Sequence, residues 1–483
     1  MSNNGISKSR VVREKLDHPV IDSDGHTVEF EPVLLDYIKK VGGESLVKRY
    51  HEALQGGRFG WYKQSPEQRL AQRITRPPWW ALPTKNTLDR ATSSMPKLLH
   101  ERLDDMGLDF SVLYPTAGLA APHLDDDEVR RGVSRAFNMF HSDIFHDYAD
   151  RLTPVAVIPM HTPQEAIEEL EFAVGKLKMK AIMMPGHVMR PIAGAKDSGS
   201  PSRHNRWFDN LCIESEYDYD PVWAKCVELK IAPTFHSGGM GWGSRTTTSN
   251  YMYNHIGHFA SAGEALCKAL FFGGVTRRFP TLKFAFLEGG TAWGASLYCD
   301  LVGHWQKRNG KAMENYNPAN LNRELLVDLY RRYGGKAVES KLDQLGQNPG
   351  MLAGTAEDAK TIDDWWRCGI ERAEDIPDLF LSHFYFGCEA DDPGNASAFD
   401  NRRNPFNARL NAIFSSDIGH WDVPDMTEVA EEAYELVEHK LITPQDFRDF
   451  VFTNPVKLWC GMNPDFFKGT RVEASVAKQL AHG

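Results

Sequence analysis

Short hydrophobic runs recur along the chain, and helical patterns separate most of them. Runs of β-branched and aromatic residues have the length and composition of buried strands. They lie near residues 19–24, 110–114, 154–159, 179–184, 231–236, 283–288, 383–388 and 411–416. Apolar residues at helical spacing predict helices over 128–148, 163–177, 221–230 and 426–440. Strands that alternate with helices imply right-handed βαβ units, so the pattern predicts an α/β fold, a closed (β/α)8 TIM barrel.

Three stretches between the predicted strands are too long for a bare barrel. We interpret them as insertions within one barrel domain of residues 19–470, forming a cap or a subunit interface. They cover about residues 40–105, 186–220 and 300–380. Residues 1–18 are predicted to form a mobile or partner-clasping arm, and residues 471–483 a tail. The insertions and the arm favour a homodimer or a larger homo-oligomer.

Composition limits the class of protein. Of the 483 residues, 42% are hydrophobic, which can build a large core, while the mean hydropathy is −0.44. No apolar run reaches the length of a membrane span, and the first 20 residues lack the apolar segment of a signal peptide. The net charge is −10 without a long block of Lys and Arg, so we expect neither a membrane nor a nucleic-acid partner.

The cysteines point to a reducing compartment. There are seven of them, none in a CxxC pair, and several lie within apolar helical or strand patterns. An odd number of buried free thiols is typical of a cytoplasmic protein and argues against a zinc site built from cysteines.

Four of the hydrophobic runs end on side chains that bind metal ions. The first run ends in Asp24-Gly25-His26, and three later runs end in His236, Glu288 and Asp417. In an α/β barrel the carboxyl ends of the strands converge on one open face, where active sites lie. Two ligands at i and i+2 on a strand point to the same side. The sequence therefore predicts a divalent metal ion at this face.

Each of these residues also has an ordinary structural explanation. Asp24 could cap a turn, His236 could be a core histidine bonded to the backbone, and Asp417 could cap the next helix. Glu288 could be a ligand, a proton shuttle or a member of an ion pair, because a buried carboxylate needs a partner. His420 could orient Asp417 from behind, or lie on the surface.

Several motifs occur in a characteristic order between residues 19 and 465. They are Ile21-Asp22 through His26, Asp150–Val155, Trp223 to His236, Gly274–Pro280, Ser416-Asp417, Asn454-Pro455 and Asn463–Phe467. In this order they resemble the amidohydrolase-related family of the amidohydrolase superfamily. The resemblance is to the branch that contains aminocarboxymuconate semialdehyde decarboxylase and related aromatic-acid decarboxylases.

The resemblance implies a metal ion held by Asp24, His26, His236 and Asp417. Two carboxylates and two imidazoles suit Zn²⁺, Mn²⁺ or Fe²⁺. The chain departs from the family pattern twice. Asp24 stands where His or Glu is usual, and Glu288 stands at the end of the sixth strand, where the family often has a His-Xaa-Gly motif. The nearby His255 and His258 could replace that missing histidine.

The resemblance and the predicted ligands favour a non-oxidative decarboxylase of an aromatic or unsaturated carboxylic acid. The metal ion would bind the substrate carboxylate and a neighbouring oxygen, and Asp417, Glu288 or His258 would supply the proton. An alternative is a hydrolase in which metal-activated water attacks a C–C, amide or lactone bond and Asp417 takes the proton. Glu288 in place of histidine favours this alternative. A barrel protein that binds without turnover is the third hypothesis.

A loop after the fifth predicted strand holds candidate substrate contacts. Arg245 could bind a carboxylate through two hydrogen bonds, while the aromatic rings of Trp242 and Tyr253 stack on the substrate. The alternative is a rim loop that packs on its own barrel. Tyr114, His187 and Glu389 are further candidates at the ends of other strands.

Overall fold

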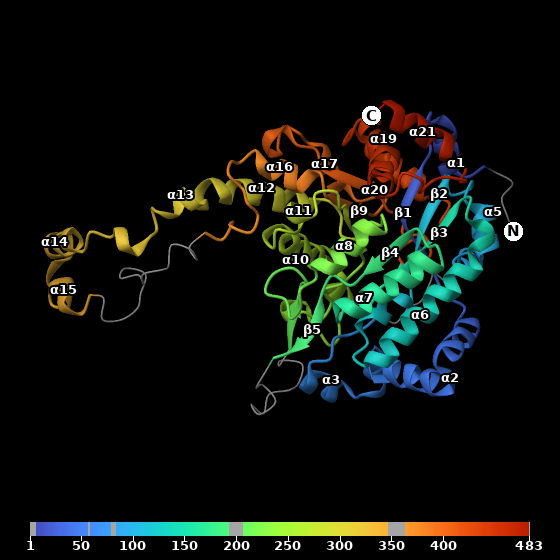
Figure 1. Ribbon diagram of the computed structural model, residues 1–483, viewed down its shortest axis with the longest axis horizontal. Helices are drawn as coiled ribbons and strands as arrows, with labels where there is room; N and C mark the ends of the chain where they lie inside the picture. The colour runs from blue at the N-terminus through green and yellow to red at the C-terminus, as the bar shows by residue number, and fades with distance from the viewer. Residues whose placement is uncertain (1–5, 57, 79–83, 193–205, 346–362, 483) are drawn as a thin grey trace.

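Eight parallel strands form the barrel in the computed structural model, which describes residues 6–56, 58–78, 84–192, 206–345 and 363–482 (Figure 1). The strands follow one another around the sheet in the order β1-β2-β3-β4-β7-β8-β9-β10. They are β1 (Ile21–Thr27), β2 (Phe110–Pro115), β3 (Leu152–Val157), β4 (Ala181–Met184), β7 (Pro233–Phe235), β8 (Phe284–Phe286), β9 (Phe384–Cys388) and β10 (Asn411–Phe414). All eight predicted strands are present, and the predicted TIM barrel is confirmed.

The barrel closes between its last strand and its first. The residues just after β10 bond to the backbone of β1: the amide of Asp417 donates to the carbonyl of Asp24 at 3.0 Å. The amide of His26 donates to the carbonyl of Ile418 at 2.7 Å. The segments that carry three of the predicted metal ligands therefore form the closing seam.

Asp22 ties β1 to both of its neighbours. Its buried carboxylate accepts hydrogen bonds from the hydroxyl of Ser111 on β2, at 2.6 Å, and from the amide and hydroxyl of Ser416, at 2.9 and 2.8 Å. A Cβ at Gly25 would lie 2.6 Å from Oδ2 of Asp22 and 2.8 Å from Oγ of Ser111. Glycine at position 25 therefore leaves room for the hydrogen bonds of Asp22, while the neighbouring residues Asp24 and His26 carry the candidate ligands.

Helices surround the barrel, and the four predicted helices are among them. Those in the outer layer are α6 (Asp127–Ile144), α7 (Pro163–Leu170), α8 (Asp220–Glu228), α10 (His258–Phe272), α12 (Ala292–Arg308), α16 (Asp375–Leu381), α18 (Val429–Glu438) and α20 (Asn454–Met462). Shorter helices join them: α9 (Tyr251–His255), α11 (Val275–Arg278), α17 (Ala396–Phe399) and α19 (Pro444–Arg448). The strands contribute a stack of aromatic rings to the core, including Phe235, Phe286 and Phe386.

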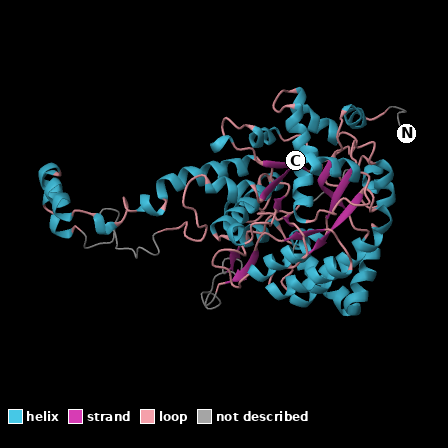
Figure 2. Cartoon of the chain, turned by 45° about the horizontal axis from the view of Figure 1, so that its top comes forward, coloured by secondary structure: helices cyan, strands magenta, loops and turns pink. Residues whose placement is uncertain are grey.

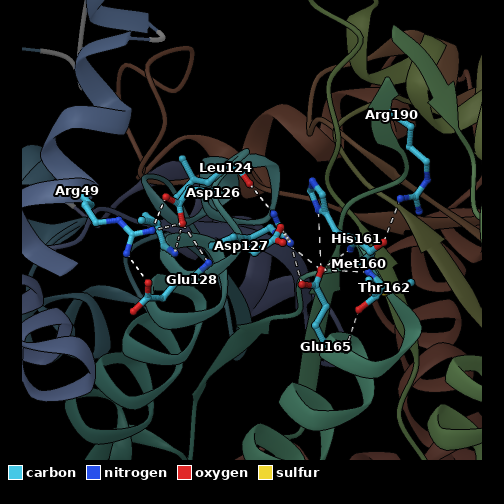
Figure 3. Close-up of polar contacts among 12 residues, drawn as sticks. Arg49, Leu124, Asp126, Asp127, Glu128, Met160, His161, Thr162, Glu165 and Arg190 are labelled. Atoms are coloured by element: carbon cyan, nitrogen blue, oxygen red, sulfur yellow. Dashed lines mark hydrogen bonds and ion pairs between the residues drawn. The ribbon is translucent and has the colours of Figure 1, made fainter. Parts of the chain in front are cut away.

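Polar contacts, some exposed and some buried, fix the helices beside β3 (Figure 3). Asp126 caps α6 by accepting from the amides of Glu128 and Val129, and it also binds Arg49. Glu165 closes a capping box with Thr162 at the start of α7. Its carboxylate also pairs at 2.9 Å with Arg130, whose side chain is only 1% exposed. These contacts position the helices that cover β2 and β3.

The insertions contain helices and one hairpin. The first holds α2 (Glu31–Gly56), α3 (Pro66–Gln72), α4 (Thr87–Thr92) and α5 (Pro96–Arg102), and the second holds the antiparallel strands β5 (Val188–Pro191) and β6 (Arg206–Asp209). The sequence pattern predicts an insertion here but not this hairpin. Residues 79–83, 193–205 and 346–362 of the predicted insertions lie outside the described residues.

The third insertion projects from the barrel as an arm (Figures 1 and 2). It continues from α12 into α13 (Gly310–Met313), α14 (Arg323–Tyr333) and α15 (Gly335–Glu339). None of the residues of these three helices is buried. Leu325, Leu329 and Tyr333 on α14 are exposed apolar side chains. The expectation that this segment forms a subunit interface or a cap stays a prediction.

Both ends of the described chain are helical and pack on the barrel. At the N-terminus, α1 (Lys8–Lys15) contacts α18, where Oγ of Ser9 accepts from the amides of Ala430 and Glu431. At the C-terminus lies α21 (Glu473–His482). Among the described helices, none combines the length and the apolar character needed to cross a membrane. The six described cysteine side chains are free thiols.

Candidate metal centre

The four predicted metal ligands meet at the end of the barrel, around His26. Its Nε2 atom lies 3.1 Å from Nε2 of His236, 3.3 Å from Oδ1 of Asp417 and 3.7 Å from Oδ1 of Asp24. Oδ1 of Asp24 is 3.9 Å from Nε2 of His236. All four residues are buried. They come from β1 and from the residues that follow β7 and β10, so strands far apart in sequence assemble one cluster.

Glu288 joins this cluster from the end of β8. Its Oε2 atom lies 2.9 Å from Nε2 of His236. Glu288 and Asp417 both have left-handed backbone conformations, with φ of 55° and 52°. Such conformations cost energy for residues with a Cβ, and they persist where the surrounding structure holds them, typically at functional sites. The local strain turns both carboxylates toward the same point.

Burial shifts the pKa values within the cluster in a direction that favours a cation. It raises the pKa of Asp24 to about 7 and those of Glu288 and Asp417 well above the usual range. It lowers the pKa of His26 well below its usual range and also lowers that of His236. Neutral imidazoles are the form that binds metals, but they cannot balance buried carboxylates. A bound cation would stabilise the ionised carboxylates and leave both histidines neutral.

Unsatisfied polar atoms support the same conclusion. Both oxygens of Asp24, both oxygens of Glu288 and Oδ1 of Asp417 are buried without a hydrogen-bond partner among the described residues. Buried polar atoms without partners are rare in proteins and call for a bound ion or water. Their geometry and donor types fit a divalent metal ion held by nitrogen and oxygen ligands.

His420 lies next to the cluster and contacts two of the predicted ligands. Its Nδ1 atom lies 3.0 Å from Oδ1 of Asp417, and its ring lies parallel to the ring of His26. An outer group that contacts a ligand in this way orients the ligand. The structure thus places His420 beside Asp417 and not on the open surface.

A cavity of about 370 Å³ adjoins the cluster, and Glu288 belongs to both. Apolar side chains form part of its wall: Met252, Ile256, Phe259 and Trp421. Acidic side chains form another part: Glu288, Glu389, Asp392 and Asp422. Burial raises the pKa of Glu389 to about 7 and that of Asp422 to about 8. No Lys or Arg is among the residues that line it.

The predicted substrate contacts Trp242, Arg245 and Tyr253 lie in the segment between β7 and α10 and are not among the residues that line this cavity. Nη1 of Arg245 donates to the carbonyl of Ile256 at 2.7 Å, and the hydroxyl of Tyr253 donates to the carbonyl of Ser244 at 2.7 Å. Trp242 packs against His187 and Phe208. The structure does not bring these three side chains together around the cavity, and their binding of substrate stays a prediction.

Other candidates occupy distinct places. His255 lines the cavity, whereas His258 reaches it through His255, with 3.2 Å between Nε2 of His258 and Nδ1 of His255. Tyr114 lies under the ligands, where its hydroxyl and Oγ1 of Thr234 are 2.7 Å apart. Glu389, predicted for the site or for a salt bridge, lines the cavity.

Sequence reasoning missed Asp422 and Trp421, which both line the cavity. They come directly after His420, four and five residues after Asp417. A second polar residue so soon after a predicted ligand was the available signal. The direction in which the Asp422 side chain points depends on the turn after Asp417, and a hydrophobic pattern does not reveal that turn.

A match to one family model agrees with the sequence resemblance. The family model described as amidohydrolase matches residues 88–317. No curated protein matches this chain. Similar solved structures include a 5-carboxyvanillate decarboxylase from Sphingomonas paucimobilis, with 13% identity, a TM-score of 0.48 and coverage of 91% of this chain and 98% of the other.

Two further similar structures are described as decarboxylases of dihydroxybenzoic acids. One is from Rhizobium, with 14% identity, a TM-score of 0.44 and coverage of 92% of this chain and 98% of the other. The other is from Polaromonas sp. JS666, described with bound manganese and 2-nitroresorcinol, with 14% identity, a TM-score of 0.47 and coverage of 92% and 97%. Over residues 88–317 the chain is similar to the amidohydrolase family.

Proposed function

We propose that this protein is a metal-dependent decarboxylase that removes CO₂ from an aromatic or unsaturated carboxylic acid without oxidation. The observation that carries the proposal is the convergence of Asp24, His26, His236 and Asp417 on one buried point. The resemblance of the sequence motifs to the aminocarboxymuconate semialdehyde decarboxylase branch supports the type of reaction. The supporting donor set is compatible with Zn²⁺ or Mn²⁺, and with Fe²⁺.

The four ligand residues would hold the metal ion. When bound, it supplies Lewis-acid polarisation and a template for the substrate carboxylate and a neighbouring oxygen. The apolar wall formed by Met252, Ile256, Phe259 and Trp421 would accept a ring and exclude water from it. The residues of this chain thus position a flat acid with its carboxylate toward the ligand cluster.

Asp417 is the proposed group for proton transfer to the carbon that loses CO₂. Its carboxyl group contacts His420 and shares a hydrogen bond with Asp422 on the cavity wall. Glu288 is the second candidate because it lies at the boundary of the cluster and the cavity. His258 acts only through His255.

A hydrolase remains the second candidate function, and one observation favours it. Four carboxylic acids and no Lys or Arg line the cavity, which does not favour an anionic substrate on charge grounds alone. In this case the cavity would accept a neutral amide, lactone or diketone, and Asp417 would take a proton from the attacking water.

The test combines metal analysis with product detection. The protein is loaded with Mn²⁺ or Zn²⁺, dialysed, and assayed for CO₂ release from a panel of hydroxylated aromatic acids, beside a panel of esters, amides and lactones. We expect CO₂ release that is lost in His236→Ala and Asp417→Ala, with bound metal lost in His236→Ala.

The control is His304→Ala, on α12, whose Nδ1 contacts the carbonyl of Asp300. It should retain metal and activity. Hydrolysis without CO₂ release would establish the second candidate function. Full metal content and activity in His236→Ala would overturn the site.

A further inference from the structure

A second group of cation ligands lies beside the first, on the cavity side of Glu288. Ligand atoms of His255, Glu288 and Asp422 all lie within 4.8 Å of one another. Glu288 also has ligand atoms within the same distance of His26 and Asp417. One carboxylate therefore belongs to two groups that could each surround an ion.

Glu288 is buried but lacks hydrogen-bond donors. Its side chain is 1% exposed, and neither oxygen has a hydrogen-bond partner among the described residues, although Oε2 lies 2.9 Å from Nε2 of His236. Oδ1 of Asp422 is likewise buried without a partner there. Carboxylate groups in this setting are costly unless a positive charge compensates them. Glu288 and Asp422 both line the same cavity, and the carboxyl group of Asp422 also shares a hydrogen bond with Asp417.

A single cation in the first cluster would leave the cavity acidic. Asp24 and Asp417 supply two carboxylates to that cluster, which balance one divalent ion. Glu288, Glu389, Asp392 and Asp422 remain on the cavity side, and no Lys or Arg among the lining residues offsets them. A second cation at this wall would supply the compensating charge that these carboxyl groups need in their ionised form.

The imidazole of His255 is already oriented for binding. Its Nδ1 atom lies 3.1 Å from the hydroxyl of Tyr251 and 3.2 Å from Nε2 of His258. Metal-bound histidines are commonly oriented by an outer group that contacts the ring in this way. These two contacts limit rotation of the His255 ring at the cavity wall and so keep it in position to bind a cation.

We infer that His255, Glu288 and Asp422 bind a second divalent cation and that Glu288 is shared between the two ions. The mixed nitrogen and oxygen ligands suit Mn²⁺ or Zn²⁺. This cation supplies the positive charge that the cavity lining lacks and would attract the acid group of a substrate. The inference rests on the proposed function in that it takes the first cation as bound.

The experiment measures metal stoichiometry instead of activity. The protein is freed of metal with chelator, dialysed against Mn²⁺, and analysed for bound manganese by elemental mass spectrometry. We expect two equivalents per chain in the wild type and one in both His255→Ala and Asp422→Asn. Electron paramagnetic resonance should show coupled Mn²⁺ pairs in the wild type and isolated Mn²⁺ in both variants.

Asp392→Asn is the matched control. Asp392 lines the same cavity outside the ligand group, and it caps a turn by accepting from the amide of Gly394, which asparagine can also do. This variant should keep two equivalents. One equivalent in the wild type overturns the second site and leaves the proposed function intact, whereas none overturns both. Two equivalents in a folded His255→Ala or Asp422→Asn protein also overturn the second site.

Discussion

The imidazole of His420 lies parallel to that of His26, with 4.1 Å between ring centroids and 4° between planes. The same residue reaches Asp417 through Nδ1. His420 therefore contacts two proposed ligands at once, one by stacking and one through a polar contact. Its removal should loosen both without removing a ligand.

We expect His420→Ala to weaken Mn²⁺ binding by roughly 10- to 100-fold, because outer partners of metal ligands contribute about this much. Isothermal titration with Mn²⁺ measures the change. His420→Asn keeps a donor near Asp417 and should recover part of the affinity. Equal affinities for His420→Ala and the wild type would show that the contact does not orient the ligand.

The metal-free protein should lose stability as the pH rises from 6.5 to 8. The folded protein holds protons on Asp24, Glu389 and Asp422 up to about pH 7 to 8, whereas the unfolded chain releases them near pH 4. The folded state thus binds more protons in this window, so its stability falls as the pH rises. Buried histidines with lowered pKa values oppose this trend at the lower end of the window, because unfolded imidazoles are about half protonated at pH 6.5, and they add little above about pH 7.5.

Thermal melting of chelator-treated protein measures this loss, which should amount to a few degrees. With saturating Mn²⁺ the trend should reverse, because the ion binds the ionised carboxylates. Asp422→Asn should flatten the pH dependence of the metal-free protein. A metal-free protein that gains stability between pH 6.5 and 8 would contradict the proposed charge balance.

Glu165→Ala should destabilise the fold strongly. The variant leaves Arg130 buried without its main partner and removes the capping box of α7, and breaking a buried pair costs about 3–5 kcal/mol. Denaturant unfolding measures the free energy. Glu168→Ala, one turn away, removes the partner of the exposed Arg131 and should cost less than about 1 kcal/mol. Similar losses in the free energy of unfolding for the two variants would show that burial does not determine how much the Glu165–Arg130 pair contributes.

Gly25→Ala should disturb the first strand and with it the ligands. The added Cβ would overlap the oxygens of Asp22 and Ser111, which link β1 to its neighbours. We expect a loss of about 1–3 kcal/mol in the free energy of unfolding and weaker metal binding. Gly175→Ala is the control, because a Cβ there meets nothing within 4 Å. Unchanged metal binding in Gly25→Ala would show that the strand adapts.

The barrel and the convergence of the four candidate ligands were predictable from the sequence because each strand carries its own signal. The run before His236 and the run before Asp417 are apolar, and each stops where the chain reaches the open face. In a parallel barrel the carboxyl ends of the strands lie at one face, so the residue that ends each run could be assigned to that face from the sequence.

The hairpin and the cavity were not predictable in this way. β5 and β6 are short, and part of their cohesion is the ion pair between Arg190 and Asp209 and a contact of Arg190 with Tyr219. The cavity wall comes from loops, where Met252, Trp421 and Asp422 face inward because of turns. Hydrophobic periodicity carries no information about either.

A metal ion bound at the closing seam would also affect the stability of the barrel, in addition to its role in the reaction. The amides of His26 and Asp417 are donors in the two backbone bonds that join the last strand to the first. Because both side chains are proposed ligands, an ion that draws them together also clamps the junction of the sheet. Chelation should thus release these amides first, so hydrogen exchange would begin where the barrel ends meet, while the opposite strands stay protected.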